Sequence, residues 1–240
     1  MIPKTIHLLW FSNDPFPVEI KMCLDTWKKV IPDYTVRRWS YDDIKNIPIP
    51  FLHEALDARV WAFAADVVRF WAVYHEGGVY MDSDIFLYKR FDEFLPQGDD
   101  AFVTFNEKWW DDDTDFGIQA AFFIGTKGST FCKAMLDYYS TQHFKNADGT
   151  FNMTVSPKIM RCVANNYGYV MEEREQHLSV LTVYPTKFLT PGKKPKRDKE
   201  AFAMHRVYHS WRKHKLGRRI ERAVKHVYNL IKYYIFRRNN

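Results

Sequence analysis

Apolar and polar residues follow one another along the chain in blocks that predict strands and helices in turn. Residues 5–11 predict a first strand, residues 18–30 have mixed helical spacing, and residues 35–39 predict a second strand. Later blocks continue the pattern, with strands expected over 79–81, 101–105, 119–124 and 178–183 and helices over 56–75, 129–139 and 156–165. This alternation is typical of an α/β fold with a mostly parallel central sheet flanked by helices.

The block at 56–75 is apolar almost all round, which predicts a helix buried on nearly every side. Asp66 and Arg69 are the exception, and their spacing of three places them on one side of that helix. A charge in such a setting is costly unless it is paired or used, so we expect a mutual salt bridge or a role in function. Gly77-Gly78 is expected to end the helix with a left-handed cap.

Two carboxylates, Asp82 and Asp84, follow the short buried strand at 79–81. Ligands bind at the carboxyl ends of strands in open α/β sheets. Four interpretations apply: a turn closed by Asp and Ser, a Mg²⁺ or Mn²⁺ site, a glycosidase carboxylate pair, and the Asp-x-Asp of a haloacid dehalogenase-like phosphatase. The glycosidase pair needs separated carboxylates and the phosphatase motif usually ends the first strand of its domain, so both are disfavoured.

Charge is distributed unevenly along the 240 residues. The net charge is +6, but residues 212–240 alone carry +9 and residues 1–211 carry −3. The basic balance therefore describes a tail and gives no reason to expect a nucleic-acid partner. We expect one domain over 1–211 and a tail over 212–240. Three widely spaced cysteines and the absence of a signal-like N-terminal segment predict a cytoplasmic protein.

The tail repeats apolar residues at helical spacing from Leu216, with Lys and Arg on the other positions. This pattern predicts a C-terminal amphipathic helix over about 216–236 that lies on an anionic membrane surface, peripheral on the inner face of the cell membrane. The alternative is that the apolar stripe packs on the domain or on a second copy.

Four segments resemble glycosyltransferase family 32, whose members include capsular polysaccharide transferases and mannosyltransferases. They are 2–11 (IPKTIHLLWF), 26–39 (from TWKK to the tryptophan), 62–69 (AFAADVVR) and 77–84 (GGVYMDSD), in that order. The resemblance is weaker in the later part of the chain, where it resumes at His205 and Ser210-Trp211. It implies a GT-A fold, a nucleotide-sugar donor, a divalent cation, commonly Mn²⁺, and transfer with retention of configuration.

The same resemblance implies roles for individual residues. Trp10 and Phe11 would lie at the nucleotide base, Asp66 and Arg69 at the donor sugar or ribose, and Asp82 and Asp84 at the cation and diphosphate. His205 would be a third metal ligand, with His209 as the alternative. Further donor contacts are expected from Gln119, Ser210 and Trp211.

Together these features predict a metal-dependent, retaining hexosyltransferase. It is expected to transfer a sugar from a nucleotide-sugar to a saccharide or lipid-linked saccharide in capsular or surface polysaccharide synthesis. Among nucleotide-sugars, a UDP-sugar is the favoured donor. The alternatives are a haloacid dehalogenase-like phosphatase and a non-catalytic membrane-binding domain.

Overall fold

The computed structural model describes residues 2–96, 98, 101–109, 112–191, 199–206, 226–231 and 233. Within those ranges the helices are α1 (Val18–Val30), α2 (Tyr41–Ile44), α3 (Pro50–Asp57), α4 (Trp61–Glu76), α5 (Thr130–Ser140) and α6 (Ser156–Asn165). The strands are β1 (Thr5–Leu9), β2 (Thr35–Trp39), β3 (Gly78–Met81), β4 (Ile85–Leu87), β5 (Phe102–Trp109), β6 (Asp112–Ile118), β7 (Phe122–Gly125), β8 (Gln176–His177), β9 (Thr182–Tyr184), β10 (Leu189–Pro191) and β11 (Ala203–His205).

The main sheet has the order β2-β1-β3-β7-β5-β9-β8, and β6 pairs with β5. β1 is parallel to β2 and β3, and β5 is parallel to β9, whereas β7 runs antiparallel to both β3 and β5. Five of the eight strands of this sheet therefore run in one direction. The expected α/β fold with a mostly parallel central sheet between helices is confirmed.

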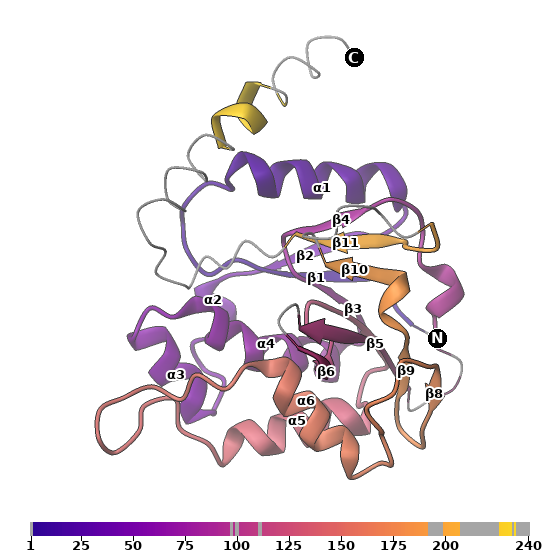
Figure 1. Ribbon diagram of the computed structural model, residues 1–240. Helices are drawn as coiled ribbons and strands as arrows, with labels where there is room; N and C mark the ends of the chain where they lie inside the picture. The colour runs from indigo at the N-terminus through magenta and orange to yellow at the C-terminus, as the bar shows by residue number, and fades with distance from the viewer. Residues whose placement is uncertain are drawn as a thin grey trace.

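Strand alternation divides the core between the two faces of the sheet. Tyr80 and Phe123 point into a cluster shared with α3, α4, α5 and α6, and their neighbours Val79 and Phe122 point into a second cluster on the side of α1. Figure 1 shows this layering, with α1 on one side of the sheet and α3 to α6 on the other.

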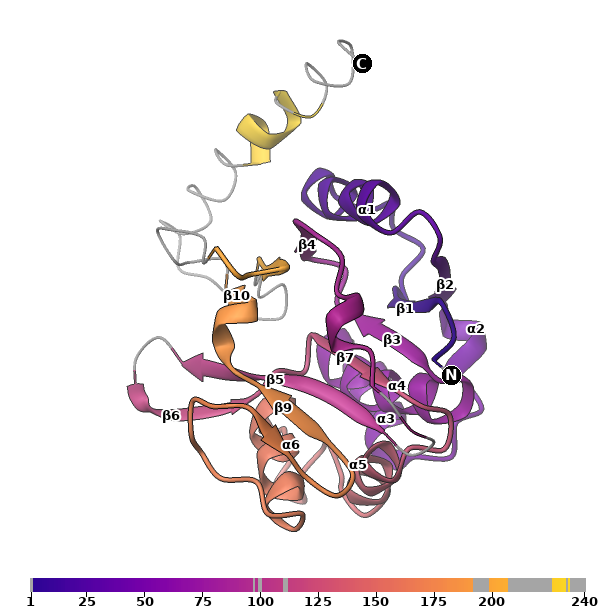
Figure 2. The same ribbon diagram turned by 90° about the vertical axis from the view of Figure 1, so that its right-hand side faces the viewer.

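A second, three-stranded sheet has the order β10-β11-β4 and lies on the α1 side of the main sheet (Figures 1 and 2). β11 is antiparallel to β4, with His205 opposite Ile85. The sequence patterns did not predict these strands, because each has only three residues, too few to display a period.

Several element boundaries differ from the expectation. The helix expected over 56–75 is two helices, because Arg59 has a φ of 56° and interrupts the path between α3 and α4. The strand expected from Gln119 begins at Phe122, and the strand expected from Leu178 begins at Thr182. Gly77 ends α4 with φ 68° but ψ −179°, so the expected left-handed cap is wrong in ψ.

Of the tail, residues 226–231 and 233 are helical, and the rest of 212–240 lies outside the described residues. His226 Nδ1 lies 2.9 Å from a carboxylate oxygen of Glu19 in α1, and the amide of Asn229 donates to the same group at 3.4 Å. Figures 1 and 2 show this helical segment near one end of α1. Among the described helices, none has the length and apolar character needed to cross a membrane.

Candidate active site

The two aspartates sit in a turn between β3 and β4. The turn is closed by a hydrogen bond from the Ile85 amide to the Asp82 carbonyl at 3.0 Å. α1 fixes the far side, since the Trp27 indole donates to the Ile85 carbonyl at 2.8 Å and the Thr26 hydroxyl accepts from the Leu87 amide at 3.0 Å. The Thr-Trp pair of α1 therefore holds the strand that follows the acidic motif.

β11 brings His205 to the same place. Its Nε2 lies 3.4 Å from Asp84 Oδ1 and 3.8 Å from Asp82 Oδ2. Each of the three residues offers one ligand atom, and these atoms lie within 4.8 Å of one another. Two carboxylates and an imidazole form a donor set that suits Mn²⁺ or Mg²⁺.

The electrostatics of this cluster favour a positive charge. Burial opposes protonation of His205, but the carboxylates of Asp84, Asp82 and Glu107 outweigh it and raise the pKa of His205 to about 9. A site that draws a proton onto an imidazole also attracts a divalent cation, which would have to displace that proton. The residues present therefore fit a divalent cation.

Asp66 and Arg69 form the buried part of the site. Arg69 Nη2 lies 2.8 Å from Asp66 Oδ1, so the expected salt bridge exists. Arg69 Nη1 also lies 3.7 Å from Asp82 Oδ1, and it donates to the Ala120 carbonyl at 2.6 Å. Burial raises the pKa of Asp66 to about 7, with Arg69 opposing that shift and Asp82 adding to it. Arg69 therefore links the helix pair to the acidic motif.

Two further contacts around Asp82 were not expected from the sequence. The Tyr80 hydroxyl donates to Asp82 Oδ1, and the Asp82 amide donates to the Ala121 carbonyl at 2.8 Å. Tyr80 looked like an ordinary core residue of a buried strand, and only its position two residues before Asp82 on a strand hinted at more. The loop before β7 therefore holds both Arg69 and Asp82 through successive carbonyls.

Gln119 begins that loop and is buried. Its side-chain carbonyl accepts from the Ala121 amide at 2.9 Å, so this oxygen is engaged within the protein. The donor-sugar contact suggested by the sequence stays a prediction, and the structure adds that Gln119 shapes the loop.

Trp10 and Phe11 follow the end of β1, which is parallel to β3 and adjacent to it. They therefore lie at the same carboxyl edge of the sheet as the acidic motif. Trp10 is held by a hydrogen bond from its indole to the Asp14 carbonyl at 2.9 Å and by the Phe16 ring at 4.8 Å. The remaining expected site residues, His209, Ser210 and Trp211, lie outside the described residues.

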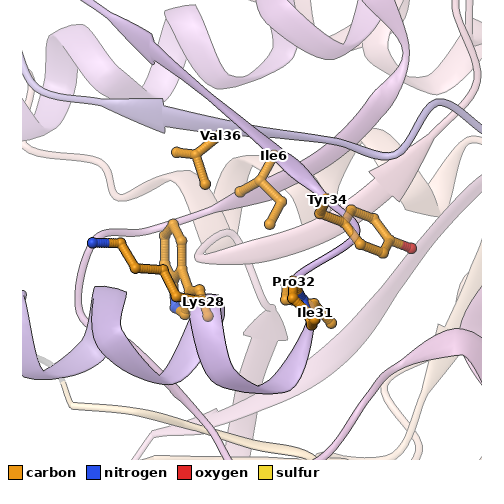
Figure 3. Close-up of a pocket in the computed structure, with 7 residues that line it drawn as sticks. Ile6, Lys28, Ile31, Pro32, Tyr34 and Val36 are labelled. Carbon is orange, nitrogen blue, oxygen red and sulfur yellow. The ribbon is translucent and has the colours of Figure 1, made fainter.

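Figure 3 shows a different hollow, between α1 and the first two strands. Its lining includes Trp27, Ile31, Tyr34 and Val36 and is apolar apart from the Lys28 amine and the tyrosine hydroxyl. It lies toward the amino ends of β1 and β2, whereas ligands of open α/β sheets bind at the carboxyl ends. The acidic edge is therefore the candidate active site.

Sequence comparison gives two matches. Residues 17–100 match the family described as the glycosyltransferase sugar-binding region containing the DXD motif. The chain is also 22% identical over 223 residues to an uncharacterised glycosyltransferase of Acanthamoeba polyphaga mimivirus, covering 89% of this chain and 85% of the relative. The chain is a glycosyltransferase. The matched residues include four positions of the candidate site, Asp66, Arg69, Asp82 and Asp84, and end before His205.

The enzyme is also similar to solved glycosyltransferase structures. The PaToxG glycosyltransferase is 18% identical with a TM-score of 0.49, covering 69% of each chain. A glycosyltransferase involved in glycosylation of the major capsid of PBCV-1 is 14% identical with a TM-score of 0.49, covering 86% of this chain and 94% of that one. The galactosyltransferase LgtC, solved with donor and acceptor sugar analogues, is 9% identical with a TM-score of 0.40, covering 84% and 86%.

Proposed function

We propose that the enzyme is a metal-dependent, retaining glycosyltransferase of the family 32 type, with a nucleotide-sugar as donor and a UDP-sugar as the first choice. The observation that carries the proposal is the convergence of Asp82, Asp84 and His205 within 4.8 Å beside the buried Asp66–Arg69 pair. Retention and the donor nucleotide rest on the family resemblance, and the catalytic domain over 1–211 rests on the change in charge at residue 212.

In this proposal Asp84 and His205 are direct ligands of Mn²⁺ or Mg²⁺ and Asp82 completes the set. The bound cation supplies Lewis-acid stabilisation of the charge that develops on the nucleoside diphosphate. Arg69 orients Asp82 from the buried side and presents, with Asp66, the polar groups for the donor sugar or ribose. Trp10, at the same sheet edge, offers an aromatic face to the base.

We further propose that residues 212–240 associate with an anionic membrane surface, which would bring the enzyme to a lipid-linked saccharide acceptor in capsular or surface polysaccharide synthesis at the inner face of the cell membrane. The support is the exposure of Val227, Tyr228 and Ile231, which are 54%, 63% and 54% exposed while Asn229 contacts α1. Apolar side chains that face away from the domain, in a segment of charge +9, suit an interfacial helix.

The test of the metal-dependent transferase is hydrolysis of UDP- and GDP-sugars with and without Mn²⁺. We expect free sugar and nucleoside diphosphate in equal amounts with wild type, and at least a 100-fold loss in Asp84→Asn with folding intact. Asp137→Asn is the matched control, since Asp137 is an exposed α5 carboxylate paired with Lys133 at 2.7 Å. Donor turnover that survives in Asp84→Asn would refute the metal site, and release of inorganic phosphate would favour the phosphatase.

The membrane proposal is tested separately by sedimentation with vesicles that contain phosphatidylserine or only phosphatidylcholine. Wild type is expected to sediment with the anionic vesicles, and the variant with Val227, Tyr228 and Ile231 changed to Ser to remain in solution. Equal sedimentation of both proteins with the anionic vesicles would show that Val227, Tyr228 and Ile231 do not mediate membrane binding.

A further inference from the structure

Two polar atoms near the acidic motif are shielded from solvent and make no hydrogen bond with any described residue. They are Nδ1 of His205 and Oε2 of Glu107. Buried polar atoms are nearly always paired, because desolvation without a partner costs free energy. The imidazole Nδ1 can donate a hydrogen bond and the carboxylate Oε2 can accept one, so the two atoms are complementary.

Glu107 faces the same space as His205. In β5, Val103 and Phe105 point into the core cluster on the α1 side, and strand alternation places Glu107 on that face too. The Phe105 ring lies 5.3 Å from the Phe202 ring, and Phe202 immediately precedes the strand of His205. The β11 end of the three-stranded sheet therefore packs against the face of β5 from which Glu107 projects.

The electrostatic effects agree with this placement. Burial raises the pKa of Glu107 to about 7, and His205 is the first of the charges that act against that rise. Glu107 in turn contributes to the raised pKa of His205. The two groups therefore interact although they come from residues 98 positions apart in the chain.

Arg69 is a less suitable partner for Glu107. Its Nη2 pairs with Asp66 at 2.8 Å, and its Nη1 and Nε donate to the Ala120 and Ala65 carbonyls at 2.6 and 3.2 Å. Asp82, the other charge acting on Glu107, has the same sign. The ring nitrogen of His205 that faces away from the aspartates is the donor left over.

We propose that Glu107 is a positioning residue for His205: its carboxylate holds the Nδ1 hydrogen through one bridging water and so keeps Nε2 unprotonated and aimed between Asp82 and Asp84. A histidine that ligates a metal commonly donates its other ring N–H to a carboxylate, which fixes tautomer and orientation. This inference rests on the proposed metal site. Glu107 itself would touch neither the cation nor the donor.

The direct test is the affinity for Mn²⁺ alone, measured in the full-length protein from the EPR signal of free Mn²⁺. Glu107→Ala is expected to weaken Mn²⁺ binding about 10- to 100-fold. Glu107→Gln keeps an acceptor oxygen in place and is expected to stay within about threefold of wild type. Glu93→Ala, an exposed glutamate 57% accessible on the surface, is the control and should bind as wild type does.

A double-mutant cycle separates positioning from a general structural effect. In a His205→Ala background the Glu107→Ala change should have no further effect on Mn²⁺ affinity, because the two residues act through one group. In turnover assays, raising Mn²⁺ should restore kcat in Glu107→Ala while its Mn²⁺ requirement stays elevated. If Glu107→Ala does not fold, Glu107→Asp replaces it and should bind Mn²⁺ more weakly than Glu107→Gln.

Distinct results overturn distinct claims. Wild-type Mn²⁺ affinity in folded Glu107→Ala, or additive losses in the cycle, would overturn the positioning role. Loss of turnover in Glu107→Gln with unchanged Mn²⁺ affinity would also overturn it, by showing that Glu107 acts on the sugar. Failure of wild type to bind Mn²⁺ would instead remove the proposed metal-dependent function.

Discussion

Replacing Tyr80 by Phe removes one hydroxyl from the acidic motif and leaves the packing of the ring unchanged. The ring is buried beside Phe123 at 5.1 Å and lies 4.9 Å from the Arg69 guanidinium carbon, and both contacts survive in Phe. The hydroxyl donates to Asp82 Oδ1, the oxygen that faces Arg69 at 3.7 Å. Without it, this carboxylate loses its nearest side-chain restraint.

The size of the effect follows from the kind of bond. A hydrogen bond to a charged group contributes about 1.5 to 3 kcal/mol, which corresponds to about 10- to 150-fold in an equilibrium or rate constant. Asp82 is 27% exposed, so water can replace part of the lost interaction. We therefore expect the lower end, a fall in Mn²⁺ affinity and in kcat/KM of about tenfold, because Asp82 would be less often oriented toward Asp84 and His205.

The assay is a Mn²⁺ titration combined with donor hydrolysis at fixed nucleotide-sugar. Tyr169→Phe is a matched control, since it also deletes a buried hydroxyl, one that donates to Asn106 at 2.7 Å on the opposite side of β5. Both variants should lose a similar small amount of stability, about 1 kcal/mol, and only Tyr80→Phe should lose Mn²⁺ affinity. Equal Mn²⁺ affinity and kcat/KM in the two variants would refute the orienting role of Tyr80.

Three further predictions concern stability. Burial raises the pKa of Asp66 from 3.8 to about 7, so the contribution of this group to wild-type stability is lost as the pH rises from about 4 to 7. At pH 8 the Asp66→Asn variant should therefore unfold in urea with a free energy up to about 4 kcal/mol higher than wild type. A lower free energy of unfolding in the variant would show that the ion pair with Arg69 outweighs the cost of burial. Burial lowers the pKa of His7, so the contribution of the neutral imidazole to stability is lost as the pH falls below 6.5, the pKa in the unfolded chain. The melting temperature of His7→Gln should therefore differ less between pH 7.5 and pH 5.5 than that of wild type. Gly78→Ala would place Cβ 2.7 Å from the Thr5 carbonyl oxygen at a residue whose φ is 108°. Its loss in free energy of unfolding should exceed the roughly 1 kcal/mol expected for Gly128→Ala, a positive-φ position with open space around it. Equal melting temperatures of the two variants would contradict this.

Sequence patterns predicted those parts of the fold whose periods are long enough to read. The bounds of α1, β2 and α6 agree with the expectation, and the two helices each bury one apolar face. The break between α3 and α4 was missed since the apolar pattern continues through it, while the positive φ of Arg59 leaves no mark on composition. The hydrophobic pattern of a sequence therefore predicts which residues are buried better than it predicts where a helix ends and the chain turns.

The site was partly predictable for a similar reason. Asp66 and Arg69 are conspicuous in an apolar helix, and the acidic motif follows a buried strand, so local sequence identifies both. Glu107 and Tyr80 carry no such signal, because their significance comes from partners in other elements. His205 entered only through resemblance, and its placement depends on β11 pairing with β4, a contact between segments more than a hundred residues apart.

The arrangement of charge explains why this site is a poor source of stability and a good receptor for a cation. Asp66 and Glu107 both have raised pKa values because burial disfavours their ionised forms, and Asp82 adds to each shift. Among the described residues, Arg69 is the permanent positive charge that acts on both carboxylates, and it is already engaged by Asp66. The remaining negative charge lies on Asp82 and Asp84, and it makes the neighbouring His205 bind its proton more tightly than usual. A divalent cation would relieve the repulsion between the two carboxylates more completely than that proton does. Binding a divalent cation should therefore stabilise the folded enzyme as well as prepare it for transfer, because the cation offsets the negative charge of Asp82 and Asp84.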